Sequence, residues 1–340
     1  MISSIVRVLK KEWFLAAMVA AMGLAVIIPQ VGKSGGVLSL DQVSAFGIAF
    51  VFFLHGIGLS PKALKDGMSN WRLHLFIQSA TFILYPLLWV IFGKGMLAFM
   101  PSALALGFCF LFVLPSTISS SVAMTAIGRG NMPGAIFNAS LSSILGIFIT
   151  PFLIQVFMGL EGAEIDITAS VMAISKMLLL PMVLGQLLRP VLLSYFEQHK
   201  SVVSKLDKYV ILLIVFNAFS DSVAEGIWHS FSIKYVIMSV VICVAVLFCV
   251  VNLMVRGART LGFNHGDEVA AVFCGSKKTL AAGVPMAKVI FGADPRLGMI
   301  LLPIMIYHPL QIFYCAVLAN RYQKKAMAQE HPTEANSECR

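Results

Sequence analysis

Charged side chains are scarce in this sequence of 340 residues. Asp, Glu, Lys and Arg together make up 12% of the chain, whereas hydrophobic residues make up 59%. Soluble domains carry roughly 25% charged residues, so the composition excludes an ordinary soluble protein. The apolar runs are about as long as the ~20 residues that a membrane-spanning helix needs. We therefore expect an all-α membrane protein, because a helix forms its backbone hydrogen bonds within itself and needs no water in the bilayer.

Acidic residues are the rarer charged class, with 16 Asp and Glu against 25 Lys and Arg. All of them fall in expected loops, near the ends of apolar runs or in the tails, which disfavours a proton pump built on buried carboxylates. No HExxH or Walker-type pattern appears, and the six cysteines show neither a disulfide framework nor metal-ligand spacing. The sequence therefore predicts no enzyme, no catalytic residues and no cofactor, with sodium as the one ion to consider.

Ten apolar runs separated by polar breaks predict ten transmembrane helices. They lie near 13–31, 42–60, 72–92, 98–127, 132–159, 169–188, 209–228, 232–254, 269–291 and 298–319. The first run follows a basic segment but lacks a signal-peptide cleavage site, so we expect it to be an uncleaved helix. Residues 1–12 then form a short cytoplasmic N-terminus, and residues 320–340 form a polar, disordered cytoplasmic tail.

Basic residues are distributed unevenly between the two sides of these runs. With an inner N-terminus, the inner segments hold Arg7, Lys10, Lys11, Lys62, Lys65, Arg72, Arg129, Arg189, Lys200, Lys205, Lys208, Arg256, Arg259, Arg321, Lys324, Lys325 and Arg340. The outer loops hold Lys33, Lys94, Lys234 and Arg296. Cytoplasmic loops are enriched in Lys and Arg, which places both termini in the cytoplasm. The net charge of +9 then comes from basic loops that orient the protein in the membrane beside anionic lipid. We therefore expect no nucleic-acid partner.

The two halves of the sequence show a similar pattern of apolar runs and polar breaks. Ten spans divide into two groups of five, and because five is odd the second group has the opposite topology. The runs 98–127 and 269–291 both pass from apolar residues into Ser, Thr, Gly and Pro and back again. The runs that follow them open on Asn131-Met132-Pro133 and on Asp294-Pro295. We therefore predict two inverted five-helix repeats whose fourth and ninth helices are broken and cross each other.

The stretch 269–292, VAAVFCGSKKTLAAGVPMAKVIFG, has Lys277 and Lys278 near its middle. One lysine at the centre of a spanning helix costs about 2.5–3.5 kcal/mol on insertion scales. Irregular backbone at mid-membrane is tolerated only where it is enclosed by protein or lines a water-filled cavity. The pattern is therefore typical of a transporter. The alternative places the lysine pair in a cytoplasmic loop between two short re-entrant pieces.

Polar side chains also gather in other apolar runs. The segment PSTISSS (115–121) holds five hydroxyls in seven residues, and Thr125 shares a helix face with Ser121. Such oxygens coordinate a cation or form hydrogen bonds with backbone groups that a helix break leaves unpaired. We take Ser120, Ser121, Thr125, Asn138, Ser140 and Gln78 as candidates for a sodium site. The alternative is that these residues only ease close helix packing.

Several longer stretches resemble one known family. FLHGIGLSPKALKDGMSNWRLHLFIQ (53–78), PSTISSSVAMTAIGRGN (115–131), GIFITPFL (146–153), FCGSKKTLAAGVPMAKVIFG (273–292) and IMIYHPLQIF (304–313) are similar to the bile acid:sodium symporter superfamily. The closest similarity is to its solute carrier family 10 member 7-like branch, which includes many bacterial proteins. The resemblance implies a panel domain near 13–60 and 169–228, a core domain near 72–159 and 232–319, and alternating access between them in a bacterial inner membrane.

The sequence departs from the sodium sites that this resemblance implies. The family's first site uses a serine and an asparagine, and the shared T-x-x-x-R-G-N pattern puts Ser121 and Val122 there. Its second site uses a glutamate and a glutamine at the break of the ninth span, where this chain reads CGSKK (274–278). The first site is therefore altered and the second is lost. We expect an ammonium at this break to replace the charge of a sodium ion and to favour an organic anion.

These observations predict a secondary active transporter of an organic anion, either bile-acid-like or another carboxylate or sulfo-conjugate, with sodium coupling through one altered site at most. The substrate-site candidates are Ser276, Lys277, Lys278, Thr279, Asn131 and His308. Two other hypotheses stay open: a cation or proton antiporter that uses His55 or His308, and a membrane regulator that transports nothing. We expect a monomer or homodimer in the lipid bilayer.

Overall fold

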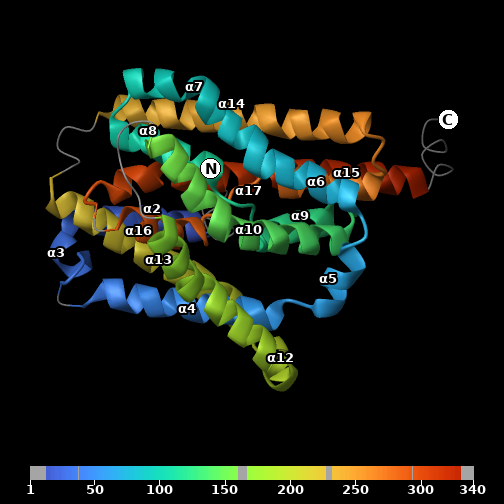
Figure 1. Cartoon of the computed structure of the whole chain (residues 1–340), viewed down its shortest axis with the longest axis horizontal. Helices are drawn as coiled ribbons and strands as arrows, with labels where there is room; N and C mark the ends of the chain where they lie inside the picture. The colour runs from blue at the N-terminus through green and yellow to red at the C-terminus, as the bar shows by residue number, and fades with distance from the viewer. Residues whose placement is uncertain (1–12, 37, 160–166, 227–231, 293, 331–340) are drawn as a thin grey trace, which may run out of the picture.

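The computed structural model describes residues 13–36, 38–159, 167–226, 232–292 and 294–330, and no strand occurs among them (Figure 1). The helices are α2 (Trp13–Ile27), α3 (Pro29–Gly32), α4 (Leu40–Gly58), α5 (Pro61–Gly67), α6 (Trp71–Ser79), α7 (Tyr85–Phe99), α8 (Ser102–Val113), α9 (Ser119–Ile127), α10 (Met132–Gly159), α11 (Ile167–Ile174), α12 (Leu180–Gln198), α13 (Lys200–Ala224), α14 (Ile233–Thr260), α15 (His265–Gly275), α16 (Gly283–Phe291) and α17 (Leu297–Glu330). Two π-helical turns, η1 (Ala80–Leu84) and η2 (Ser175–Leu179), join α6 to α7 and α11 to α12. The prediction of an all-α protein is confirmed for the described residues.

Six helical stretches among these residues are long and apolar enough to cross a membrane. They are Leu40–Gly58, Trp71–Phe99, Met132–Met158, Thr168–Gln198, Ile233–Thr260 and Leu297–Ala328. Two further apolar helices are shorter, at Ala16–Ile27 and Ser102–Val113. This is the architecture of a multi-pass membrane protein, and the arrangement of ten helices in inverted repeats stays a prediction.

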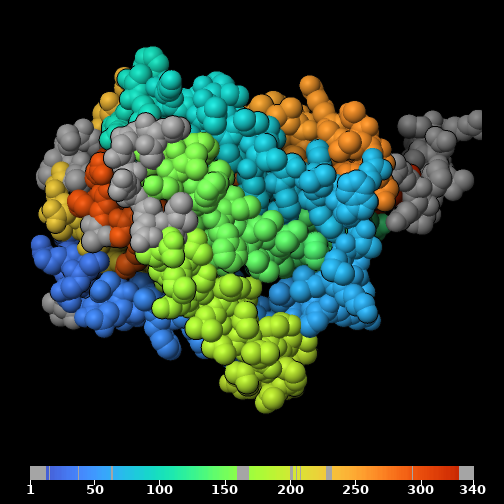
Figure 2. Space-filling model, in the orientation of Figure 1, coloured from blue at the N-terminus to red at the C-terminus, as the bar shows by residue number. Residues whose placement is uncertain are grey.

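In Figure 1, α8 lies toward the left of the molecule and α15 toward the right, and both helices are buried. α7 and α14 run along one side of the molecule, and α4 and α12 lie on the opposite side (Figure 1). In Figure 2, α10, in green, lies between α6 and α7 in cyan and α12 in yellow-green. Residues 267–275 are all buried, as are residues 103–114 apart from Leu106. A helix that is apolar on every face is buried among other helices, which explains the burial of α8.

Two non-helical segments interrupt helical stretches next to α8 and α15. The first break, residues 114–118, separates α8 from α9, and the second break, residues 276–282, separates α15 from α16. Leu114 has φ −65° and ψ 148°. This is the extended conformation that a residue preceding proline prefers, so Pro115 ends α8. Gly275 is the last residue of α15.

α4 and α12 are held together by two glycines. A Cβ atom on Gly56 would lie 2.0 Å from the carbonyl oxygen of Met182, and one on Gly185 would lie 2.0 Å from that of Phe53. Real Cβ atoms do not approach backbone so closely, so both positions require glycine. The two backbones are therefore in direct contact, and this contact fixes the helix that presents His55.

The disordered tail predicted from residue 320 is wrong for residues 320–330, because α17 continues to Glu330. Tyr322 on this extension donates a hydrogen bond to Glu268 Oε1 at 2.7 Å and packs edge-on against Phe273. These contacts explain why the helix persists beyond its apolar part. Residues 331–340 and the N-terminus 1–12 lie outside the described residues.

Candidate functional site

The first and second breaks lie against each other, and we call this region the junction. The backbone N–H of Thr279 in the second break donates to the carbonyl oxygen of Pro115 in the first, at 3.0 Å. Segments that are far apart in the sequence are thus joined where neither is helical. The backbone groups that the two helix ends leave without intrahelical partners gather here.

Hydroxyl groups of the first break and of α9 donate hydrogen bonds to the carbonyl oxygens at the end of α15. Ser116 Oγ donates to the Cys274 carbonyl at 2.6 Å, and Ser121 Oγ donates to the Phe273 carbonyl at 3.0 Å. Carbonyls in the last turn of a helix have no intrahelical donor. The serine-rich segment therefore supplies donors that α15 lacks.

Lys278 in return donates hydrogen bonds to carbonyl oxygens at the end of α8. Its Nζ donates to the carbonyl oxygens of Thr81 at 2.9 Å, Phe112 at 2.9 Å and Leu114 at 2.7 Å. The same Nζ lies 4.0 Å from the ring centroid of Tyr85, within range of a cation–π contact. An ammonium has three N–H donors, and all three are engaged with the protein backbone.

Lys277 is equally buried but has fewer partners. Its Nζ donates to the carbonyl oxygen of Ser120 at 2.8 Å and lies 5.5 Å from the ring centroid of Phe273. Both lysine side chains have 0% exposure. The two adjacent lysines thus differ in their surroundings, since Lys278 faces the end of α8 and Lys277 faces the beginning of α9.

Three polar residues that the sequence analysis did not select complete the junction. Tyr85 and Tyr307 both donate to the carbonyl oxygen of Ser276, at 2.6 and 3.1 Å. The amide of Gln311 accepts from the backbone N–H of Lys278 and donates to its carbonyl oxygen, each at 2.8 Å. A polar side chain inside an apolar run was the available signal, and Gln311 falls within the IYHPLQ stretch.

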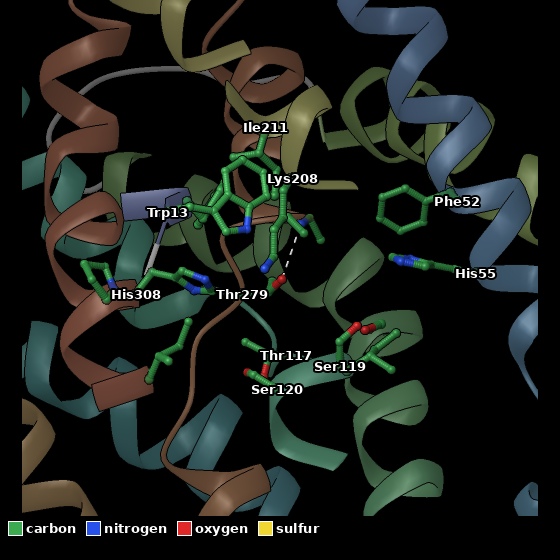
Figure 3. A pocket seen from close by; sticks show the side chains of 17 residues that line it. Trp13, Phe52, His55, Thr117, Ser119, Ser120, Lys208, Ile211, Thr279 and His308 are labelled. Atoms are coloured by element: carbon green, nitrogen blue, oxygen red, sulfur yellow. Dashed lines mark hydrogen bonds between the residues drawn. The ribbon is translucent and has the colours of Figure 1, made fainter. Parts of the chain in front are cut away.

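A cavity of about 310 Å³ opens beside the junction (Figure 3). Its apolar lining is Trp13, Phe14, Phe52, Ile118, Ile211, Ala281, Ala282, Pro309 and Ile312, and its polar lining is His55, Thr117, Ser119, Ser120, Ser143, Lys208, Thr279 and His308. Figure 3 shows His308 and His55 on opposite sides of the cavity, with Lys208 and Trp13 on one wall and the hydroxyls of Thr117, Ser119 and Ser120 on another. No acidic residue is among the lining residues.

Two helices begin at this cavity. Ser119 and Ser120 form the first turn of α9, and Ala281 and Ala282 directly precede α16. The N-terminal end of a helix carries partial positive charge and unpaired N–H groups, which attract anions. Lys208 adds a full positive charge to the wall, 5.4 Å from the ring centroid of Trp13. The cavity therefore combines a positive polar side with an aromatic wall.

The predicted substrate residues divide between the cavity and the junction. Thr279 and His308 line the cavity. Lys277 and Lys278 are in the junction, where their ammonium groups face backbone carbonyls. Ser276 is there too, and its hydroxyl donates to the carbonyl of its own helix one turn earlier. In this structure the two lysines neither line the cavity nor point into it.

Asn131, the remaining substrate candidate, lies in a separate polar cluster. Its Nδ2 donates to Asp267 Oδ1 at 2.7 Å, and Asn70 and Asn264 donate to Asp267 Oδ2 at 2.8 and 3.2 Å. Asn70 and Asn264 also cap the first turns of α6 and α15. The carboxylate thus ties together the starts of three helices, because Asn131 precedes α10 directly.

The sodium-site candidates fall into more than one group. Gln78 Nε2 donates to the carbonyl and to the Oδ1 of Asn138 at 3.1 and 3.2 Å, and Asn138 Nδ2 contacts His74 Nδ1 at 2.9 Å. Ser140 lies on α10 with Asn138, but its hydroxyl donates to the backbone of its own helix at 2.8 Å. Asn138 Oδ1 and Ser140 Oγ thus have protein partners, whereas the buried Gln78 Oε1 has none among the described residues.

The other three candidates lie on α9. The hydroxyls of Ser120 and Ser121 both contact Thr117 Oγ1, at 2.7 and 2.8 Å, and Thr125 Oγ1 donates to the Ser121 carbonyl at 2.8 Å. Ser120 is the member of this group that lines the cavity. Of the six candidates, the oxygens nearest to the cavity are therefore those at the start of α9.

Comparison with known proteins identifies the family. The SBF-like CPA transporter family matches residues 12–324. The chain belongs to this family. It is 39% identical over 298 residues to the putative symporter YfeH of Escherichia coli, covering 88% of this chain and 89% of that protein. It is 31% identical over 313 residues to the sodium/bile acid cotransporter 7 of Mus musculus, covering 91% and 92%.

Membership of the SBF-like family confirms the resemblance to the bile acid:sodium symporters and to their member 7-like branch. A relative in Pseudomonas aeruginosa is 40% identical over 312 residues, so similarity extends over nearly the whole chain in bacteria as well. Together with its apolar helices, this makes the protein a multi-pass membrane transporter of the symporter type, from a family of transporters and not of enzymes.

Proposed function

We propose that this SBF-like transporter moves an organic anion across a bacterial inner membrane by secondary active transport. The observation that supports it is the cavity at the beginning of α9 and α16, which has Lys208 in its wall and no acidic lining residue. An anionic head group is stabilised by helix N-termini and by a lysine. The apolar body of the substrate would pack against Trp13, Phe14 and Phe52, as ligands do in largely apolar pockets with a few polar groups.

The lining of the cavity also supports alternating access between two domains. The proposed panel domain supplies Trp13, Phe14, Phe52, His55, Lys208 and Ile211, and the proposed core domain supplies Thr117, Ile118, Ser119, Ser120, Ser143, Thr279, Ala281, Ala282, His308, Pro309 and Ile312. A site between two groups of helices is exposed to one side of the membrane or to the other as the groups move. We keep ten helices in inverted repeats and cytoplasmic termini as part of this proposal.

Sodium enters the proposal through one group of oxygens only. The hydroxyl of Thr117 contacts those of Ser120 and Ser121 beside the cavity. Sodium bound there would couple to an anion in the same cavity through their opposite charges. A second candidate function is proton or cation antiport, because His55 and His308 face the cavity from opposite sides (Figure 3).

The test is uptake by the purified protein in liposomes, with a panel of radiolabelled anions that includes a conjugated bile acid and short carboxylates. We expect uptake of at least one anion. In Lys208→Gln we expect the KM for that anion to rise about tenfold, because a charge at the binding wall is lost. Lys205→Gln is the matched control, since Lys205 lies on the same helix and is exposed outside the cavity.

Imposed ion gradients separate the alternatives. Uptake that rises with an inward sodium gradient supports coupling through the serine group, and uptake that follows a pH gradient and is lost in His308→Gln supports the histidine mechanism. If no anion is transported and none shifts the thermal unfolding midpoint, the proposal of an anion transporter is wrong and the non-transporting regulator is favoured.

A further inference from the structure

The carbonyl oxygens around Lys278 Nζ come from three separate places in the chain. Thr81 belongs to the π-helical turn η1, Phe112 to the last turn of α8, and Leu114 to the first break. Their oxygens lie 2.9, 2.9 and 2.7 Å from Nζ. We call these three oxygens the carbonyl cage. Each of them has lost its usual helical donor for a reason that can be read from the structure.

A π turn and a proline together leave the Thr81 carbonyl without its usual backbone donor. In η1 the N–H of Tyr85 donates to the carbonyl of Ala80, five residues back, and not to that of Thr81. The next residue in the same register is Pro86, which has no N–H. The Thr81 carbonyl is therefore left without a backbone donor.

Phe112 and Leu114 lose their donors at the end of α8. In a continuing helix the N–H of Ser116 would donate to the Phe112 carbonyl, but it donates to Ser142 Oγ at 2.9 Å. Pro115 ends the helix, so the Leu114 carbonyl also leaves the helical pattern. Both oxygens lie at the C-terminal, partially negative end of α8, where a cation is favoured.

The cage has the chemistry of a monovalent-cation site. Several backbone carbonyls that converge on one point replace the water around a sodium or potassium ion in channels. Here the three N–H donors of one ammonium meet three carbonyls, and the Tyr85 ring lies 4.0 Å from Nζ. No N–H of Lys278 remains for a substrate. All three partners are backbone carbonyl dipoles, and no carboxylate is among them.

We infer that the carbonyl cage is a monovalent-cation site which the protein's own Lys278 ammonium occupies. The positive charge that a dissociable ion would bring to the junction is thus covalently part of the chain. Its consequence for transport is that no sodium ion is taken up at this position, and that consequence rests on the proposed function. The occupancy itself is testable without any transport.

The experiment uses Lys278→Ala in the full chain, purified in detergent. The variant lacks the last three carbons and the ammonium of the lysine side chain, and n-propylammonium carries three carbons and an ammonium. We expect sodium or n-propylammonium at saturating concentration to raise the thermal unfolding midpoint of Lys278→Ala by about 5 °C. We expect choline at equal ionic strength, which is too large for the cage, to have no effect, and the wild-type midpoint to be the same in all three salts.

Lys277→Ala is the matched control, because it removes an equally buried neighbour with a single carbonyl partner. We expect its midpoint not to respond to n-propylammonium. Equal responses of the two variants, or no response of Lys278→Ala, would overturn the inference. A failed uptake assay with an intact salt response would instead count against the proposed function alone.

Lys278→Met covers the case in which the alanine variant does not fold. Methionine keeps much of the length of the side chain but provides no charge and no donor. We expect its yield of monodisperse protein to fall at least fivefold below wild type, with no recovery in n-propylammonium because the space is filled. A methionine variant as stable as wild type would show that the cage needs no cation, and the inference would fail.

Discussion

The two breaks at the junction differ in chemistry although both interrupt a buried helix. The first break and the start of α9 present hydroxyls and no charge, whereas the second break presents two ammonium groups. Hydroxyls of the first donate to the end of α15, and ammonium groups of the second donate to the end of α8 and to Ser120. The two breaks are therefore complementary: each provides the donors that the other needs.

The difference also shows how charge and function are divided. The charged groups of the second break are turned away from the cavity, and the neutral hydroxyls of Thr117, Ser119 and Ser120 face it. A buried polar group without a hydrogen-bond partner costs about 1–3 kcal/mol. The lysines thus have the larger part in holding the breaks together, and the serines have the larger part in contact with a ligand.

The largest expected effect is that of removing both charges from the second break. The double variant Lys277→Gln with Lys278→Gln leaves at least two buried carbonyls without donors, since a glutamine amide is shorter and has two N–H groups. We expect a loss of about 2–6 kcal/mol in stability, because each orphaned group costs about 1–3 kcal/mol. Size-exclusion yield and the thermal unfolding midpoint measure it. A double variant that folds normally but no longer binds an anion would restore the two lysines as substrate ligands.

A smaller effect is expected when the donors of the first break are removed. In Ser116→Ala with Ser121→Ala, the carbonyls of Cys274 and Phe273 lose their hydroxyl donors. We expect a loss of about 2 kcal/mol, with an anion Kd in sodium-free buffer that stays within twofold of wild type. Thermal midpoints and anion titrations of the purified protein measure both quantities.

Ser140→Ala is the matched control for that pair. Ser140 is also buried, but its hydroxyl donates to the Ile136 carbonyl within its own helix. That carbonyl has a regular helical donor as well, so we expect a loss below about 0.5 kcal/mol. If Ser140→Ala loses as much stability as the serine pair, the loss comes from removing a buried hydroxyl and not from unpairing the carbonyls at the end of α15.

The smallest effect on stability is expected for Ser120→Ala. Its hydroxyl contacts Thr117 and lines the cavity, so its removal exposes no buried carbonyl. We expect stability within about 0.5 kcal/mol of wild type and an anion Kd about fivefold higher, the size of one hydrogen bond of about 1 kcal/mol. If Ser120→Ala loses as much stability as the double variant of Ser116 and Ser121, with unchanged affinity, the division of roles between the breaks is contradicted.

The composition and the apolar runs were sufficient to predict an all-α membrane protein, because burial in the bilayer constrains nearly every residue of a span. The non-helical segment around Lys277 and Lys278 was predictable for the same reason, since two lysines at mid-depth are costly. The serine-rich segment next to Pro115 was predictable because proline ends a helix. In each case a local physical rule was enough.

The direction in which the lysines point was not predictable from local rules. It depends on Thr81, whose carbonyl is freed by a π turn, and on Gln311, which pairs with the backbone of Lys278 from α17. Asn131 was chosen for a polar position before a proline, but its partner Asp267 is 136 residues away. Such roles come from contacts between distant segments, which a single sequence does not reveal.

The covalent attachment of Lys278 has a consequence for the source of energy. An ion gradient performs work only through an ion that leaves one compartment and enters the other. The side chain at the carbonyl cage stays in the chain through every cycle, so no sodium ion crosses the membrane at this position. Accumulation of a solute against its own concentration must then draw on a different ion, on the membrane potential acting on the solute, or on exchange for a second solute.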